Sequence, residues 1–326
     1  RPSRTAAPSG VIAQAAFACK KAWLSVMAGG YPASVEDIDV EASFEGAPRP
    51  TRVGLAVSAA SASWRQWKAS DLRMEASCAG GKLSVQANGK GDFWKLEALS
   101  LAAPDPLSPD AAEGRAEVEW KAEAGLPPEI ETLARGFGCD VSALGRAALS
   151  GRAAAPLAPL LRRQAPVVEI TEARMSLAPA NIMAPGGLTI EGFRADAGLT
   201  AKVADGQATA RVAPGSGVWI GRVATAEGLA VEPGAAGRLA GVEVQGDGLR
   251  ATAPLAAPKS ARMAGVARLV LAPSRVKTGG AEMVSGLSGE ARFDLRATAK
   301  SLAVLLQPGA WFGFDKVSAG GAVVKP

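Results

Sequence analysis

The residues of this chain that could do chemistry are its carboxylates, its lysines and three cysteines, because it contains no histidine. Without histidine there is no usual general base, no imidazole metal ligand and no Ser-His-Asp triad. Paired carboxylates or a lysine could still act as catalytic groups. However, most acids occupy alternate positions of predicted strands or lie in turns, where exposure to solvent accounts for them. We therefore expect no catalytic site, no metal and no cofactor.

Two short patterns also fail to define a site. Cys19, Cys78 and Cys139 are odd in number, far apart and without a CxxC pair, so they indicate neither a disulfide framework nor a zinc site. Gly215-Ser216-Gly217 with Gly221 imitates a dinucleotide-binding fingerprint, but the sixth position is Ile220 and the stretch leads into a strand. We interpret it as a turn.

Aromatic and charged residues are spread thinly. Trp64-Arg65-Gln66-Trp67 could mark a membrane interface, a glycan platform or a cation–π contact. Read as one strand, its two tryptophans point to opposite faces, which favours an ordinary contact at a sheet end. The net charge of +5 is not gathered into any run of five or six like charges, so no nucleic-acid partner is expected.

Composition favours many turns and a thin core. Apolar residues make up 48% of the chain, but alanine dominates them and aromatics reach only 5%. The 38 glycines and 22 prolines recur at short intervals along the whole chain. This distribution is typical of many short connections between strands.

Three dipeptide turns test strand pairing directly, because a two-residue hairpin loop fixes which residues face each other. Around Asp205-Gly206 the apolar pairs are Val203 with Ala208, Ala201 with Ala210, and Leu199 with Val212. Around Gly80-Gly81 they are Cys78 with Leu83, Ala76 with Val85, and Met74 with Ala87. Around Asp247-Gly248 they are Val244 with Ala251, and Val242 with Ala253. In all three, polar residues fall on the other face.

Further alternation predicts more strands. Ala116, Val118, Trp120 and Ala122 alternate with charged residues, as do Phe293, Leu295 and Ala297. Other strands are predicted near 52–58, 93–101, 167–177, 188–195, 217–226, 237–244 and 261–271. Short helices are predicted at 128–137, 157–163 and 302–306, and an amphipathic helix at 11–27.

The fold class that follows is mainly β, an antiparallel β-hairpin meander with a few short helices. We divide the chain into an amphipathic helix and lead-in (1–34), a first sheet part (35–126), a short helical insertion (127–165) and a second sheet part (166–326). Because it opens at Arg1 without an initiator methionine, we expect a fragment of a longer protein.

Small alternating phrases recur, such as Ala148-Leu-Ser-Gly-Arg152, Leu188-Thr-Ile-Glu-Gly192 and Leu287-Ser-Gly-Glu-Ala-Arg292. Over most of residues 35–326 this texture resembles the AsmA-like proteins of Gram-negative envelopes, above all the YdbH-type intermembrane phospholipid transport proteins. It is also similar to DUF2125-type and secretion-system N-type envelope proteins. The resemblance implies that the β-hairpin meander is elongated and forms a curved, groove-like sheet. It also implies a periplasmic protein anchored in the inner membrane, a phospholipid ligand and an outer-membrane or envelope protein partner.

On this reading an apolar β-groove carries acyl chains. Its candidate lining residues are Met74, Ala76, Val85, Val118, Trp120, Leu199, Ala201, Val203, Ala208, Ala210, Val212, Phe293 and Leu295. The alternative is a structural or interaction module in which a second layer closes the apolar face and binding uses edge strands. A hydrolase with clustered acids in a polar cleft is the third and least favoured hypothesis.

Overall fold

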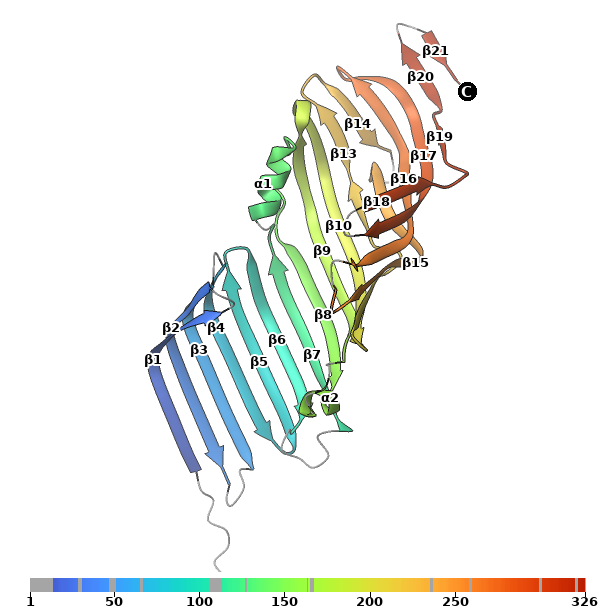
Figure 1. Ribbon diagram of the computed structural model, residues 1–326. Helices are drawn as coiled ribbons and strands as arrows, with labels where there is room; N and C mark the ends of the chain where they lie inside the picture. The colour runs from blue at the N-terminus through green and yellow to red at the C-terminus, as the bar shows by residue number, and fades with distance from the viewer. Residues whose placement is uncertain are drawn as a thin grey trace, which may run out of the picture. The chain divides into compact units, whose positions relative to one another are not determined.

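The structure is a computed structural model that describes residues 14–28, 31–46, 51–64, 67–105, 113–126, 128–162, 164, 167–234, 237–257, 260–298, 301–319 and 322–325. Strands make up 77% of it and helices 5%, so the prediction of a mainly β meander of antiparallel hairpins is confirmed. The chain forms two compact units, residues 1–122 with 152–164 and residues 123–151 with 165–326. Figure 1 shows both.

The first unit is a plain meander, in which each strand pairs antiparallel with the next from β1 to β6. The strands are β1 (Gln14–Ala28), β2 (Tyr31–Glu45), β3 (Arg52–Trp64), β4 (Trp67–Ala79), β5 (Lys82–Gly91) and β6 (Trp94–Pro104). Strand β7 (Arg115–Ala124) follows, and Lys121 on it forms an ion pair of 3.0 Å with Glu97 of β6. The boundary between the units falls within β7 and within β8 (Ala147–Pro156).

The amphipathic helix predicted at 11–27 is wrong, because residues 14–28 form β1 and pair with β2. Its apolar residues keep strand alternation up to Cys19 and resume it at Ala22, after a bulge where Lys21 has a φ of 55°. The bulge adds one residue to β1 between Cys19 and Ala22. Cys19, Ala22 and Val26 are therefore spaced three and four residues apart along the sequence. These spacings imitate one face of a helix.

The second unit contains five long strands and several short ones. The long strands are β9 (Val168–Ala184), β10 (Leu188–Ala204), β15 (Ala240–Pro254), β16 (Arg262–Thr278) and β17 (Ala281–Thr298). The short strands are β11 (Gln207–Val212), β12 (Gly217–Ile220), β13 (Arg222–Thr225), β14 (Leu229–Pro233), β18 (Ser301–Leu306), β19 (Trp311–Gly313), β20 (Lys316–Ala319) and β21 (Ala322–Val324). Strand β10 pairs with β9 on one side and with β11, β12 and β13 in succession on the other. The long strands of this unit curve visibly in Figure 1.

Two of the three predicted hairpin registers are confirmed pair for pair, at Gly80-Gly81 and at Asp205-Gly206. All four turn residues have positive φ, from 52° to 77°, as a type I′ turn requires.

The hairpin predicted at Asp247-Gly248 is wrong. Here β15 runs straight on through a bulge at Gly246, Asp247 and Gly248, pairing with β12 before it and with β11 after it. Gly246 and Gly248 have positive φ (58° and 87°) but Asp247 between them does not, so the chain is not reversed. Gln245 and Arg250 are five residues apart on β15, whereas their partners Val266 and Ala264 on β16 are two residues apart. The bulge therefore adds three residues, an odd number, to β15. Val242 and Val244 therefore share a face with Ala251.

The other local predictions are partly confirmed. Helix α1 (Pro128–Gly136) and helix α2 (Leu157–Leu161) lie where helices were expected, but 302–306 is strand β18, paired with β17. Trp64 ends β3 and Trp67 begins β4, where the two are paired in the β3–β4 register, so the assumption that they belong to one strand is wrong. Arg65 and Gln66 lie outside the described residues.

The buried hydrophobic residues are few and mostly small. They are Ala59, Ala103, Ala116, Ala230, Ala267, Ala291, Trp219, Leu239 and Val244. The chain exposes 20972 Å², against about 12,500 Å² for a compact protein of its mass of 33.0 kDa. Its stability therefore comes from sheet pairing and half-buried side chains more than from an enclosed core.

Candidate functional site

The first unit carries a continuous apolar face. We use "rung" for a row of residues that face one another across neighbouring strands. Three rungs that cross β1 to β6 are wholly apolar: Ala15, Phe44, Val53, Cys78, Leu83 and Ala103; Phe17, Ala42, Leu55, Ala76, Val85 and Leu101; and Cys19, Val40, Val57, Met74, Ala87 and Leu99. Phe17 is 61% exposed, Phe44 41% and Met74 36%, so this face remains accessible to solvent.

A hollow of about 430 Å³ lies at one end of this face, over β2, β3, β4 and the start of β6. Ala33, Val35, Ala62, Ala69 and the indole of Trp94 line it. Trp94 stands over Gly91, where a side chain would collide with the ring. Ser34, Ser63 and Lys68 also border the hollow, but its surface is almost entirely carbon, which suits an apolar ligand.

The second unit also carries an apolar face. One rung crosses seven strands and is formed by Ile170, Ala201, Ala210, Ala251, Met263, Ala297 and Leu302. Another crosses six and is formed by Leu177, Ala195, Val218, Val242, Leu269 and Ala291. Val242 is 45% exposed and Leu302 is 67% exposed. Among the described residues of each unit, no second sheet lies over these rungs.

The predicted lining residues fall into two sets. Met74, Ala76 and Val85 occupy the apolar rungs of the first unit, and Val118 and Trp120 are half-buried on β7, opposite in direction to exposed Glu119 and Lys121. In the second unit Leu199, Ala201, Val203, Ala208, Ala210 and Val212 are neighbours across β10 and β11. Phe293 and Leu295 lie on β17, opposite Leu306 and Val304 of β18.

Sequence reasoning missed one strand of each face. Strand β1 and strand β18 were read as helices, so Phe17, Cys19, Leu302, Val304 and Leu306 were not included among the candidates. The alternation of Leu302, Val304 and Leu306 was present in the sequence, but apolar Ala303 and Leu305 between them hid it.

Cys78 and Cys19 both lie on the apolar face of the first unit. Burial raises the pKa of the Cys78 thiol, and the neighbouring carboxylate of Asp105 raises it further. The neutral thiol is thereby favoured, which agrees with the expectation that Cys78 packs and does not react.

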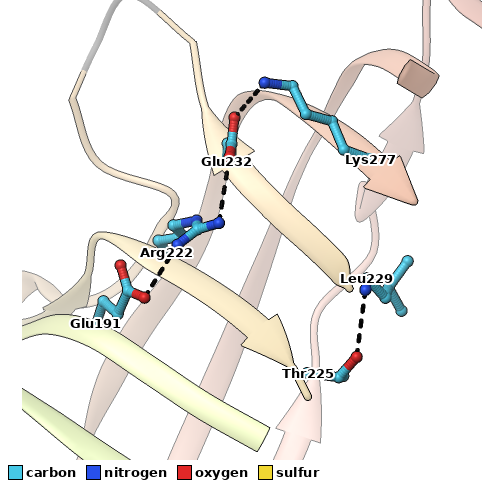
Figure 2. Close-up of polar contacts among 6 residues, drawn as sticks. All are labelled: Glu191, Arg222, Thr225, Leu229, Glu232 and Lys277. Carbon is cyan, nitrogen blue, oxygen red and sulfur yellow. Dashed lines mark hydrogen bonds and ion pairs between the residues drawn. The ribbon is translucent and has the colours of Figure 1, made fainter. Parts of the chain in front are cut away.

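The opposite face of the second unit is held by ion pairs, shown in Figure 2. Arg222 of β13 binds Glu191 of β10 at 3.0 Å and Glu232 of β14 at 3.4 Å, and Lys277 of β16 binds Glu232 at 2.6 Å. The hydrogen bond from Lys277 lowers the pKa of Glu232, and the charges of Lys277 and Arg222 lower it further against the effect of partial burial. These contacts tie the four strands β10, β13, β14 and β16 together.

Trp219 lies on this same polar side and is among the buried residues. Its indole Nε1 donates to a carboxylate oxygen of Glu243 at 3.0 Å, and the guanidinium of Arg194 lies 5.2 Å from the ring centroid. A side chain at Gly241 would collide with the ring, so the indole lies close against the sheet backbone. Trp219 is therefore a structural residue of the polar face.

The described residues hold no cluster of three or more cysteine, aspartate or glutamate side chains that could bind a metal. Within the described ranges, no helix has the length and hydropathy to cross a bilayer.

The chain was also compared with known proteins. No protein-family model, no curated protein and no solved structure matches it.

Proposed function

We propose that this protein binds the acyl chains of phospholipids along the apolar faces of its sheets and passes them between membranes. The observation that carries the proposal is the set of three wholly apolar rungs across β1 to β6, in which Phe17, Phe44 and Met74 are between a third and two thirds exposed and the leucine and valine side chains are half-buried. A soluble protein rarely leaves so wide an apolar surface bare without a ligand or partner for it. The resemblance to AsmA-like envelope proteins adds a periplasmic location and an inner-membrane anchor to the proposal.

The physical chemistry of the face suits transfer more than storage. Each methylene removed from water stabilises the complex by about 0.8 kcal/mol, and this gain is the same wherever along the rungs the chain lies. The rungs supply alanine, valine, leucine and methionine without a polar group between them. An acyl chain can therefore be held without being fixed at one position.

Adjacent residues of one strand provide a matched test. Val85→Glu places a carboxylate on the apolar face, whereas Ser84→Glu places it on the other side of the same strand. Ala210→Glu and Ser176→Glu form the corresponding pair in the second unit, because Ser176 lies on the polar side of β9, opposite Asp196 of β10. Native mass spectrometry after incubation with phosphatidylethanolamine and phosphatidylglycerol vesicles measures bound lipid, and circular dichroism confirms folding.

We expect Val85→Glu and Ala210→Glu to lose most bound lipid, because a charge against an acyl chain costs several kcal/mol, and the two controls to retain it. A photo-crosslinker at Val203 should capture lipid, and one at Ser176 should not. The proposal fails if the folded wild-type protein carries no lipid, or if both members of each pair lose it equally.

A structural or interaction module is the second candidate, and strand β18 favours it. Leu302, Val304, Leu305 and Leu306 are each more than half exposed, and among the described strands β18 pairs with β17 alone. Such an edge can accept a strand from a partner protein. A folded protein that binds no lipid but changes oligomeric state when Val304 is replaced by Lys would favour this module.

A further inference from the structure

The polar side of the second unit has a hollow of its own, with a volume of about 560 Å³, over β9, β10, β11 and β15. Two polar rungs border it: Glu169, Lys202, Thr209 and Thr252 on one side, and Thr200, Arg211 and Arg250 on the other. Between them runs the backbone at Ala201, Ala210 and Ala251, whose side chains point to the apolar face. The hollow is therefore separate from the proposed lipid surface.

Positive charge is concentrated in this hollow. Arg211 and Arg250 face each other directly in the β11–β15 register, an arrangement that like charges make unfavourable. Lys202 lies opposite Glu169, and Arg262 of β16 lies opposite Thr252 at the edge. The lining thus holds three cations against one carboxylate, and Arg262 adds a fourth cation beside it.

The bulge of β15 positions both arginines. The Nε of Arg211 donates to the backbone carbonyl oxygen of Asp247 at 2.5 Å, and a guanidinium nitrogen of Arg250 lies 3.5 Å from the Asp247 carboxylate. Asp247 itself is on the rim, with a side chain that is 86% exposed. Two guanidinium groups are thereby held side by side, with most of their N–H donors still available.

We propose that this hollow binds a phosphate group. Guanidinium forks match the geometry of phosphate oxygens, and the hydroxyls of Thr200, Thr209 and Thr252 supply further donors around them. A dianion between Arg211 and Arg250 would also relieve their mutual repulsion. The phosphate can belong to a soluble phosphate ester or to the headgroup of an anionic lipid, and one experiment distinguishes these sources.

The test compares the wild-type protein with Arg211→Gln/Arg250→Gln and with Arg174→Gln/Arg275→Gln. The second double variant removes the same charge from arginines paired with Glu172 and Glu282 outside the hollow. Thermal unfolding and calorimetry are measured in sodium phosphate and in sodium chloride of equal ionic strength. Co-sedimentation is measured with phosphatidylglycerol vesicles and with phosphatidylcholine vesicles.

We expect phosphate to raise the unfolding midpoint above that in chloride for the wild-type protein and the control. For Arg211→Gln/Arg250→Gln the affinity should fall at least about tenfold, because two charge-assisted contacts are lost. Binding of free phosphate alone identifies a soluble ester, and binding of phosphatidylglycerol vesicles alone identifies a lipid headgroup. Equal losses in both double variants, or no preference over chloride and phosphatidylcholine, overturn the proposal. Val85→Glu, which tests the lipid surface of the first unit, should leave the phosphate response intact.

Discussion

The Nε of Arg211 on β11 donates a hydrogen bond of 2.5 Å to the backbone carbonyl oxygen of Asp247 on β15. This contact joins two strands at a point where the sequence predicts a chain reversal. Because β15 bulges here and continues, it pairs with β12 and β11 in turn and places Arg250 directly beside Arg211. One local backbone feature thus extends the apolar rungs on one face and gathers cations on the other.

Replacing Gly248 in the bulge of β15 should lower the stability of the protein more than replacing Gly246. Gly248 has a φ of 87°, and a Cβ there would collide with the carbonyl oxygen of Val212, whereas Gly246 has a φ of 58° and open space around it. We expect Gly246→Ala to lower the free energy of unfolding by about 1 kcal/mol and Gly248→Ala by about 3 kcal/mol or more. Urea unfolding measures both. Equal effects would show that steric contact with β11 does not hold the bulge.

The network around Glu232 should make stability depend on pH in one direction. Its pKa is lowered in the folded protein, so the folded state binds fewer protons than the unfolded state near that pKa. The stabilisation is present above the usual carboxyl pKa of 4.5 and is lost as pH falls below it. Lys277→Gln removes the largest cause and should raise the Glu232 pKa, as carboxyl NMR titration can measure. An unchanged titration curve would exclude Lys277 as the partner.

The thiol of Cys78 should alkylate slowly at neutral pH, because burial and Asp105 both raise its pKa. In a protein with Cys19 and Cys139 replaced by Ser, Asp105→Asn should increase the alkylation rate at fixed pH. Iodoacetamide labelling followed by mass spectrometry measures the rate. Bound phospholipid should slow the labelling further, since Cys78 lies in an apolar rung. Faster labelling with lipid present would contradict the placement of acyl chains on this face.

Trp219 should contribute to stability in two separable ways. Trp219→Phe keeps most of the ring packing but loses the hydrogen bond to Glu243, so we expect a loss of about 1 kcal/mol. Trp219→Ala also loses the packing and should cost about 3 kcal/mol or more. Denaturant unfolding of the two variants provides the comparison. Equal losses would mean that the hydrogen bond, and not the ring, accounts for the effect.

The sequence by itself determined the mainly β class, the alternation of apolar and polar faces, and the register of two hairpins. These features are local, because a type I′ turn at Gly80-Gly81 or Asp205-Gly206 fixes the partners of the residues on either side. Val203, Ala210 and Val85 could therefore be assigned to an apolar face without coordinates.

Only the tertiary structure decided where a strand bulges and continues. At Lys21 and at Asp247 inserted residues shift the alternation, and sequence reasoning took the first for a helix and the second for a turn. Whether a chain bulges or reverses depends on which strands lie beside it, and β15 continues because β11, β12 and β16 are there to pair with it. The cation-lined hollow beside Asp247 follows from that choice, since Arg211 and Arg250 lie 39 positions apart in the sequence and meet only through the pairing of β11 with β15.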